Sequence, residues 1–174
     1  QYTKQQFGED VEISLFKSVD KFLEKATEKS PDVIGLSVYY WNMAQNQYVV
    51  KKIREMYGKK VVIVLGGPSI DNEINEQRKF LSTVFPEADA VIINEGEIGF
   101  TNIIKKIFDD RDNLFKDSID GISFLSGDQV VQGLAVGTSI DLSTVGSPYL
   151  SGLMDEFMDS DYQPLIQTSR FCPY

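Results

Sequence analysis

The chain has 174 residues, of which 42% are hydrophobic and 25% are charged, a balance typical of one soluble domain with a full core. Its net charge of −9 argues against nucleic acid as a partner, because phosphate binding needs clustered Lys and Arg. It has no histidine and one cysteine, which excludes a Ser-His-Asp triad, a histidine-ligated metal and an internal disulfide within this chain. No apolar run has the length of a membrane span and no signal peptide is visible, so we expect a cytoplasmic protein without membrane contacts.

Strands and helices are predicted to alternate through the first 110 residues. The alternation of apolar and polar residues over Val11–Leu15 favours a strand, and Ser18 is predicted to cap a helix that ends before Pro31. Three near-continuous apolar runs then indicate strands buried on both faces, each followed by a helix with apolar residues at helical spacing. In chain order these are strand 33–38, helix 44–57, strand 61–65, helix 73–84, strand 90–93 and helix 99–108.

The character of the sequence changes after Asp109. Ser126-Gly127-Asp128 is a good hairpin turn between Ile119–Leu125 and Gln129–Gln132. From Gly133 the chain is rich in Gly, Ser, Thr, Asp and Pro, and it is predicted to be loop with one short helix near 150–158. A loop of this length is unusual inside a compact domain, so we interpret it as a connector to a further part of the protein.

The predicted fold class is α/β: a doubly wound, Rossmann-like (flavodoxin-like), mostly parallel sheet with a small C-terminal β-hairpin and a loop-rich connector. In an open parallel sheet the ligand binds beyond the carboxyl ends of the strands. All three buried strands end there in small or polar residues, which makes this edge the predicted binding site. The candidate binding residues are Ser37, Tyr39, Gly66, Gly67, Pro68, Ser69, Glu95, Gly96 and Glu97.

The first two loops offer neutral groups, each with a second interpretation. The Ser37 hydroxyl can bond a ligand without burying a charge, or it can bond its own turn. Gly66 and Gly67 let the backbone approach a bulky ligand, although a turn that merely needs glycine explains them nearly as well. Pro68 presets φ, and Ser69 either contacts the ligand or caps the next helix.

Carboxylates and aromatic rings complete the predicted site. Glu95 and Glu97, on either side of Gly96, either accept hydrogen bonds from the ligand or stabilise the start of the following helix. General acid-base catalysis by this pair is not expected, because neither carboxylate has an evident partner. The aromatic run Tyr39–Trp41 either lines the mouth of a pocket or packs against another domain.

Several motifs in order resemble the cobalamin-binding (B12-binding) domain that precedes the catalytic core of radical S-adenosylmethionine (SAM) enzymes. They are Pro31–Ser37, Val64–Pro68, Ala88–Glu97 and Asp120-Gly121-Ile122. The final residues, Ile166–Tyr174, look like the strand that leads into the CxxxCxxC motif of that family, with Cys172 as its first cysteine and the others beyond Tyr174. The match covers about Pro31 to Tyr174.

The resemblance implies a division into residues 9–110 as the cobalamin-binding domain, 111–165 as hairpin and connector, and 166–174 as the start of the radical core. It implies that cobalamin binds at the predicted edge, and that a [4Fe-4S] cluster and SAM bind only in the full-length protein. The partner of this chain would be its own C-terminal radical core, and the reaction would be methyl transfer or related radical chemistry. The chain by itself is expected to have no catalytic activity, because it cannot assemble the cluster.

Two alternatives stay open at this point. Classical cobalamin domains carry an Asp-x-His-x-x-Gly loop whose histidine ligates cobalt, and this chain has no histidine. Many members that precede a radical core also lack it and hold the cofactor without a protein nitrogen ligand. The first alternative is therefore a degenerate domain that binds no cofactor and acts as a scaffold. The second, a receiver-like or flavodoxin-like module, is disfavoured because neither Val38 nor Leu65 is followed by a phosphorylatable Asp or a phosphate-cradling loop.

Overall fold

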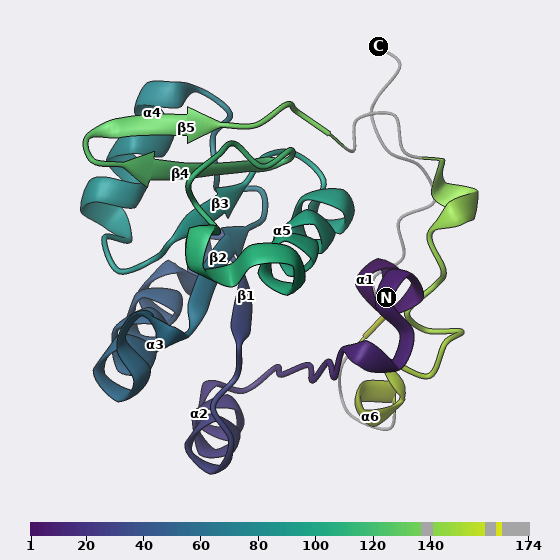
Figure 1. Cartoon of the computed structure of the whole chain (residues 1–174). Helices are drawn as coiled ribbons and strands as arrows, with labels where there is room; N and C mark the ends of the chain where they lie inside the picture. Colours follow the sequence, from purple (N-terminus) through teal and green to yellow (C-terminus); the bar gives the residue numbers. More distant parts are fainter. Residues whose placement is uncertain (137–140, 159–162, 165–174) are drawn as a thin grey trace. The chain divides into compact units, whose positions relative to one another are not determined.

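The computed structural model describes residues 1–136, 141–158 and 163–164. It contains two compact units, Tyr2–Ile140 and the segment Asp141–Tyr174 with Gln1. The larger unit has a five-stranded sheet with helices on both of its faces (Figure 1). Among the described residues, none of the helices is both long enough and apolar enough to cross a membrane.

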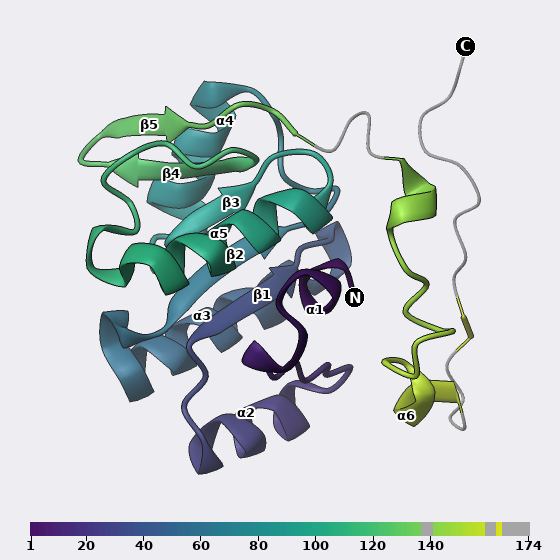
Figure 2. The same cartoon turned by 45° about the vertical axis from the view of Figure 1, so that its right-hand side comes forward.

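The sheet is mixed and its strands follow one another in sequence order. The first three are parallel: β1 (Val33–Ser37), β2 (Val62–Gly66) and β3 (Ala90–Ile92). The hairpin β4 (Ile122–Ser126) and β5 (Gln129–Gln132) continues the same sheet with antiparallel pairing (Figure 2). Because β4 runs against β3, the start of β4 and the end of β5 lie at the edge where the three parallel strands end.

The helices begin and end where the local sequence supplies caps. Ser18 Oγ accepts a hydrogen bond from Lys21 N at 3.4 Å at the start of α2, and Gly58, with a φ of 57°, follows the end of α3. The π-helical turn Phe80–Val84 extends α4. The helices are α1 (Tyr2–Phe7), α2 (Val19–Glu28), α3 (Met43–Tyr57), α4 (Ile74–Lys79), α5 (Gly96–Asp110) and, in the smaller unit, α6 (Asp155–Met158).

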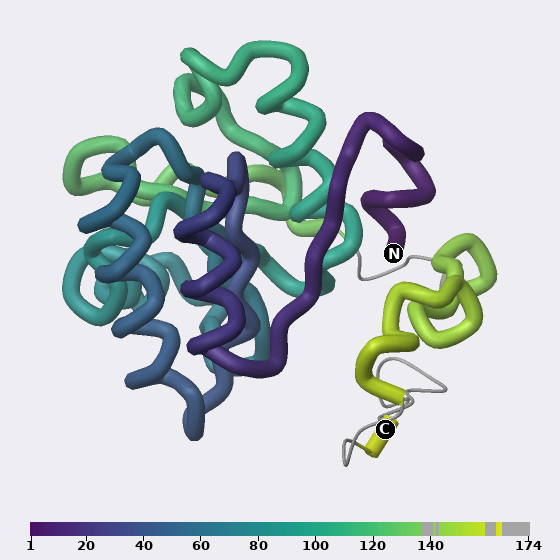
Figure 3. The backbone as a smooth tube through the Cα atoms, turned by 90° about the horizontal axis from the view of Figure 1, so that it is seen from below, coloured from purple at the N-terminus to yellow at the C-terminus, as the bar shows by residue number. Residues whose placement is uncertain are grey.

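Two apolar clusters hold the layers together, one on each face of the sheet. On one face α2, α3 and the turn after α4 cover alternate residues of β1, β2 and β3, among them Ile34, Ile63 and Val91. Figure 3 shows α2 and α3 side by side on this face. On the other face α5 contributes Ile103, which packs with Val64 and the hairpin residues. The sheet is thus buried on both faces at its centre, as the continuous apolar runs predict.

The predicted fold class is confirmed, with one element wrong. Val11–Leu15 forms no strand, although its alternation favours one, because alternation makes a strand only where a neighbouring strand offers backbone partners. The fifth strand of the sheet comes instead from the predicted hairpin. The compact unit Tyr2–Ile140 contains that hairpin, while the predicted domain boundaries at 110 and 165 stay predictions.

A nearly buried carboxylate fixes the amino ends of the strands. Asp89, just before β3, pairs with Arg54 of α3, and it accepts hydrogen bonds from Ile63 N at 2.8 Å and from Lys59 Nζ at 2.9 Å. The side chains of Asp89 and Arg54 are each only 11% exposed. The arrangement connects α3, β2 and β3 through one charged group.

We therefore expect Asp89→Ala to lower the free energy of unfolding by about 3 kcal/mol, because it leaves the nearly buried Arg54 guanidinium without its counter-ion. Urea unfolding followed by circular dichroism measures this. The control is Glu28→Gln, which removes an exposed pair with Lys25 and should leave the unfolding midpoint almost unchanged. Equal losses in the two variants would contradict the structural role of Asp89.

Candidate functional site

The loops after β1 and β2 are bonded directly to each other at the carboxyl edge of the sheet. Ser37 lies opposite Gly66 in the register, Val38 N donates to Gly66 O at 2.6 Å, and Ser69 N donates to Val38 O at 3.3 Å. The predicted residues of these two loops are thus brought together. Of these, Ser37, Gly67 and Pro68 are exposed, whereas Gly66 and Ser69 are half-buried.

The two glycines of the second loop have different roles. Gly67 has a φ of 109°, and a Cβ there would lie 2.7 Å from Val38 O and 2.9 Å from Val38 N. Only glycine allows this backbone approach. A Cβ on Gly66 would meet nothing closer than the Ile92 side chain at 3.5 Å, which is an ordinary contact. The packing of the chain on itself therefore accounts for Gly67 but not for Gly66.

The loop after β3 is tied to the loop after β2 by two amide side chains. Asn72 Nδ2 donates to Asn94 Oδ1 at 2.7 Å. Asn94 has a φ of 60°, the one positive φ outside glycine in the described part of the chain. Asparagine tolerates this conformation better than most residues. Sequence reasoning missed Asn72 and gave Asn94 no role of its own, although an Asn directly after a predicted buried strand is a recognisable turn signal.

The three residues at the start of α5 lie where they were predicted, at the same edge. Glu95 occupies the N-cap position but makes no capping hydrogen bond with its side chain, and Glu97 lies in the first helical turn. Both carboxylates are half-buried. Gly96 is exposed, and a Cβ there would have open space within 4 Å. The capping interpretation of Glu95 is therefore not supported, whereas Glu97 is placed favourably for the helix dipole.

Close packing of two glycines holds the start of α5 against the hairpin. A Cβ on Gly99 would lie 2.7 Å from Gly121 O, and the same carbonyl accepts a hydrogen bond from Ile93 N at 2.8 Å. The neighbouring Asp120 Oδ1 accepts from Leu134 N at 3.1 Å. Asp120 and Leu134, both exposed, thus extend the edge beyond the predicted residues.

An aromatic group stands at the end of β1. The rings of Tyr39 and Trp41 are stacked, with centroids 4.6 Å apart and planes inclined by 20°. Trp41 is 78% exposed and Tyr40 is 88% exposed, which is unusual for rings of this size. Stacked and solvent-facing rings at a ligand-binding edge offer a flat apolar surface with polar tips.

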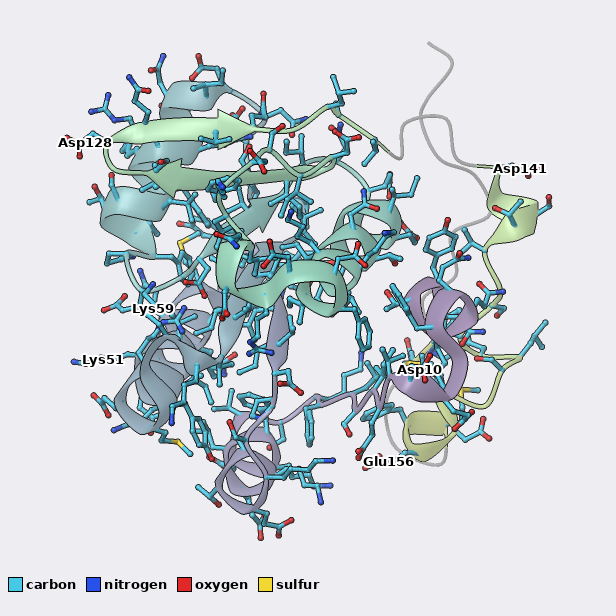
Figure 4. The ribbon with its side chains drawn as sticks, in the orientation of Figure 1. Asp10, Lys51, Lys59, Asp128, Asp141 and Glu156 are labelled. Atoms are coloured by element: carbon cyan, nitrogen blue, oxygen red, sulfur yellow. The ribbon has the colours of Figure 1, made fainter. Side chains whose placement is uncertain are left out.

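The opposite, amino end of the sheet has a cavity of about 440 Å³. Figure 4 labels Lys59, which lines it, and Asp128 in the hairpin turn, on this side of the unit. At this cavity Lys59 pairs with Asp89, and Arg111 donates to Asp32 and to the Lys60 carbonyl. We therefore interpret this end as structural and place the functional site at the carboxyl edge.

The site offers no metal-binding cluster. No group of three or more His, Cys, Asp or Glu side chains within the described residues is arranged to hold a metal ion. Cys172, the predicted first cysteine of a cluster motif, lies outside those residues. The edge presents hydroxyl, carboxamide, carboxylate and backbone groups, which can form hydrogen bonds with polar substituents of a ligand.

Comparison with known families matches residues 2–104 to the B12 binding domain. The chain belongs to this family and is a cobalamin-binding module. The matched segment includes all three loops of the carboxyl edge, from Ser37 to Glu97. The resemblance seen in the sequence is thereby confirmed.

Three characterised relatives are methyltransferases by name. The chain is 30% identical over 151 residues to the cobalamin-dependent radical SAM methyltransferase TokK of Streptomyces tokunonensis, covering 83% of this chain and 21% of that protein. It is 27% identical over 150 residues to 2-(S-pantetheinyl)-carbapenam-3-carboxylate methyltransferase of Streptantibioticus cattleyicolor, which covers 83% of this chain and 21% of that protein. It is 27% identical over 127 residues to cytidylyl-2-hydroxyethylphosphonate methyltransferase of Streptomyces wedmorensis, which covers 72% of this chain and 22% of that protein. The chain therefore spans about a fifth of the length of these relatives, and no solved structure matches it.

The chemistry of the edge fits cobalamin held by its periphery. Cobalamin carries amide side chains and a nucleotide tail around its corrin ring, and these pair with hydroxyl, carboxamide and backbone groups. Ser37, Asn94 and Gly96 present such groups on the exposed surface of the edge. Because the chain has no histidine, it supplies no imidazole to cobalt.

We expect Gly67→Ala to lower the free energy of unfolding by about 3 kcal/mol, because the new methyl group meets the Val38 backbone at an unfavourable φ. Gly66→Ala is the matched control and should lower the free energy of unfolding by less than about 1 kcal/mol. Urea unfolding of the two purified variants makes the comparison. If both glycines tolerate alanine equally, the close approach of the two loops is wrong.

Proposed function

We propose that the chain binds cobalamin at the carboxyl edge of its sheet, as the cofactor-binding part of a cobalamin-dependent radical SAM methyltransferase. The observation that carries this is the family match over residues 2–104, the segment that brings the three loops to one edge. Bound cobalamin would supply a methyl group carried on cobalt. The residues of this chain would bind and orient it.

The roles we assign follow from the chemistry of each loop. Ser37 and Ser69 donate or accept hydrogen bonds at the cofactor periphery, and Gly66 to Pro68 bring backbone close to it. Glu95 and Glu97 accept hydrogen bonds from its amide groups. Tyr39 and its stacking partner Trp41 supply apolar contact area.

The radical chemistry belongs to a longer protein in this proposal. The relatives whose names include methyltransferase support it. Cys172 would be the first of the cysteines whose thiolates hold a [4Fe-4S] cluster, and that cluster would bind and cleave SAM in a radical core located in the cytoplasm. The substrate that receives the methyl group would bind at that core.

One observation favours a second candidate, the cofactor-free scaffold. Gly67, which looks like a ligand-related glycine in the sequence, is explained by the packing of the chain against Val38. The absence of histidine points the same way. A direct binding measurement separates the two candidates.

We expect the purified chain to retain hydroxocobalamin on gel filtration, read by visible absorbance in the protein peak. The spectrum should show no sign of histidine bound to cobalt, because this chain has no histidine. Gly96→Leu should weaken retention about tenfold or more by filling the open space at the edge, which corresponds to about 1.4 kcal/mol. Thermal unfolding of Gly96→Leu, followed by circular dichroism, checks that the fold is kept.

The matched control is Glu24→Leu, on an exposed position of α2 outside the three loops, which should bind like the wild type. A wild-type chain that elutes free of cobalamin would contradict the proposal and support the scaffold. Equal binding by Gly96→Leu would move the site away from this edge.

For the radical part, we expect a longer protein that contains this chain to bind iron and sulfide on anaerobic reconstitution, with the broad visible absorbance of a [4Fe-4S] cluster. Cys172→Ala should abolish that absorbance, because one thiolate of the cluster is lost. Retention of cobalamin by the same variant is the control for folding. A cluster that survives the substitution would contradict the role of Cys172.

A further inference from the structure

A buried asparagine lies beneath the loop that carries the aromatic group. Asn46, on the first turn of α3, is only 8% exposed. Its Nδ2 donates to Ser37 O at 3.0 Å and to Asn42 Oδ1 at 3.1 Å. Asn42 in turn donates from Nδ2 to Ser37 O at 2.9 Å and accepts from Tyr39 N at 2.8 Å. Two carboxamides thus bind one end of the loop through its backbone.

These hydrogen bonds replace the ladder of the sheet where β1 stops. The last link to β2 is Val38 N donating to Gly66 O. Ser37 O accepts hydrogen bonds from both side-chain amides, so this carbonyl keeps its partners where the sheet ladder ends. The chain therefore leaves the sheet at Ser37 and turns at once into the short 3₁₀ segment Tyr40–Asn42 and α3.

The packing of α3 does not require an amide at position 46. The neighbouring buried residues of the helix, such as Val49, Val50 and Ile53, are all apolar, and leucine has the same branched heavy-atom skeleton as asparagine together with a better helix propensity. A buried carboxamide must also be fully hydrogen-bonded to be tolerated. Its benefit therefore lies in the loop that it holds.

We propose that Asn46, acting through Asn42, is a positioning residue that fixes the turn from Ser37 to Trp41 in its ligand-binding shape. The stacked pair Tyr39 and Trp41 is thereby presented at the edge before the ligand arrives. A preformed loop loses less conformational entropy on binding. This inference rests on the proposed cobalamin site and deepens it, because it names residues that tune affinity without touching the cofactor.

The experiment uses Trp41, the single tryptophan of the chain, as its probe. Asn46→Leu keeps the branched heavy-atom skeleton and removes both donors, and Asn46→Asp keeps both shape and volume while placing an oxygen against Ser37 O. Both variants should lower the steady-state fluorescence anisotropy of Trp41 in the absence of ligand, because the turn is released. Thr101→Val is the matched control. It removes a buried hydroxyl bonded to Thr3 and Glu97 on the other face of the sheet, and it should leave the anisotropy unchanged.

The second measurement is the affinity for hydroxocobalamin, read from the quenching of Trp41 fluorescence. A parallel titration of free N-acetyltryptophanamide corrects for the light that the cofactor itself absorbs. Asn46→Leu should bind about five- to tenfold more weakly than the wild type, the range expected from the loss of one or two hydrogen bonds. The unfolding midpoint of Asn46→Leu in urea should fall by no more than that of Thr101→Val. A loss of affinity without a matching loss of stability is the result that a merely structural role does not give.

The outcomes separate this inference from the function on which it rests. A wild-type chain that cobalamin does not quench overturns the proposed function. A wild type that binds, together with an Asn46→Leu variant of equal affinity and anisotropy, overturns the positioning role alone. Wild-type behaviour of Asn46→Asp also overturns it, because the donors would then be dispensable.

Discussion

The contact between the loops after β1 and β2 is the constraint on which the carboxyl edge depends. The parallel register puts Ser37 beside Gly66, and the hydrogen bonds of Val38 to Gly66 and Ser69 join the two loops. That approach leaves no room for a Cβ on Gly67. Two chain segments separated by about one strand-helix unit thus form one surface, and a ligand at this edge meets both at once.

Neutral amide side chains continue this surface across the sheet. Asn46 binds the first loop from below, Asn72 connects the second loop to Asn94 in the third, and buried Gln77 donates to Asp71 O at 2.9 Å and accepts from Gln132. Each of these bonds satisfies a backbone or amide group where the sheet ladder has ended. Uncharged amides do this at a smaller desolvation cost than ion pairs, so the edge is ordered without fixed charge beneath it.

The sequence predicts the fold well because its signals are local and redundant. The apolar runs at Val33, Val61 and Ala90 predict strands; β2 and β3 are buried on both faces, whereas β1 has exposed residues. Ser18 and Gly58 mark helix ends by their own chemistry. The strand prediction for Val11–Leu15 is wrong because an alternating pattern does not show whether a partner strand is present. The amide network of the site was equally invisible, since the bond from Asn46 to Ser37 depends on the angle at which α3 returns to β1. The loops that form the site were predictable from where the strands stop, but the side chains that hold those loops were not.

The same reasoning indicates how a chain without histidine can serve a cobalt cofactor. A histidine ligand would fix cobalamin at its metal, and its affinity would follow the protonation state of the imidazole. Here the edge contains hydroxyls, amides, carboxylates, exposed rings and an open glycine at position 96, and it contains no imidazole. At the proposed site, affinity would then come from shape and from hydrogen bonds to the cofactor periphery, and such affinity would depend on loop order. The ordered loops would stand in for the missing metal bond, and the buried amides that hold them would contribute to binding.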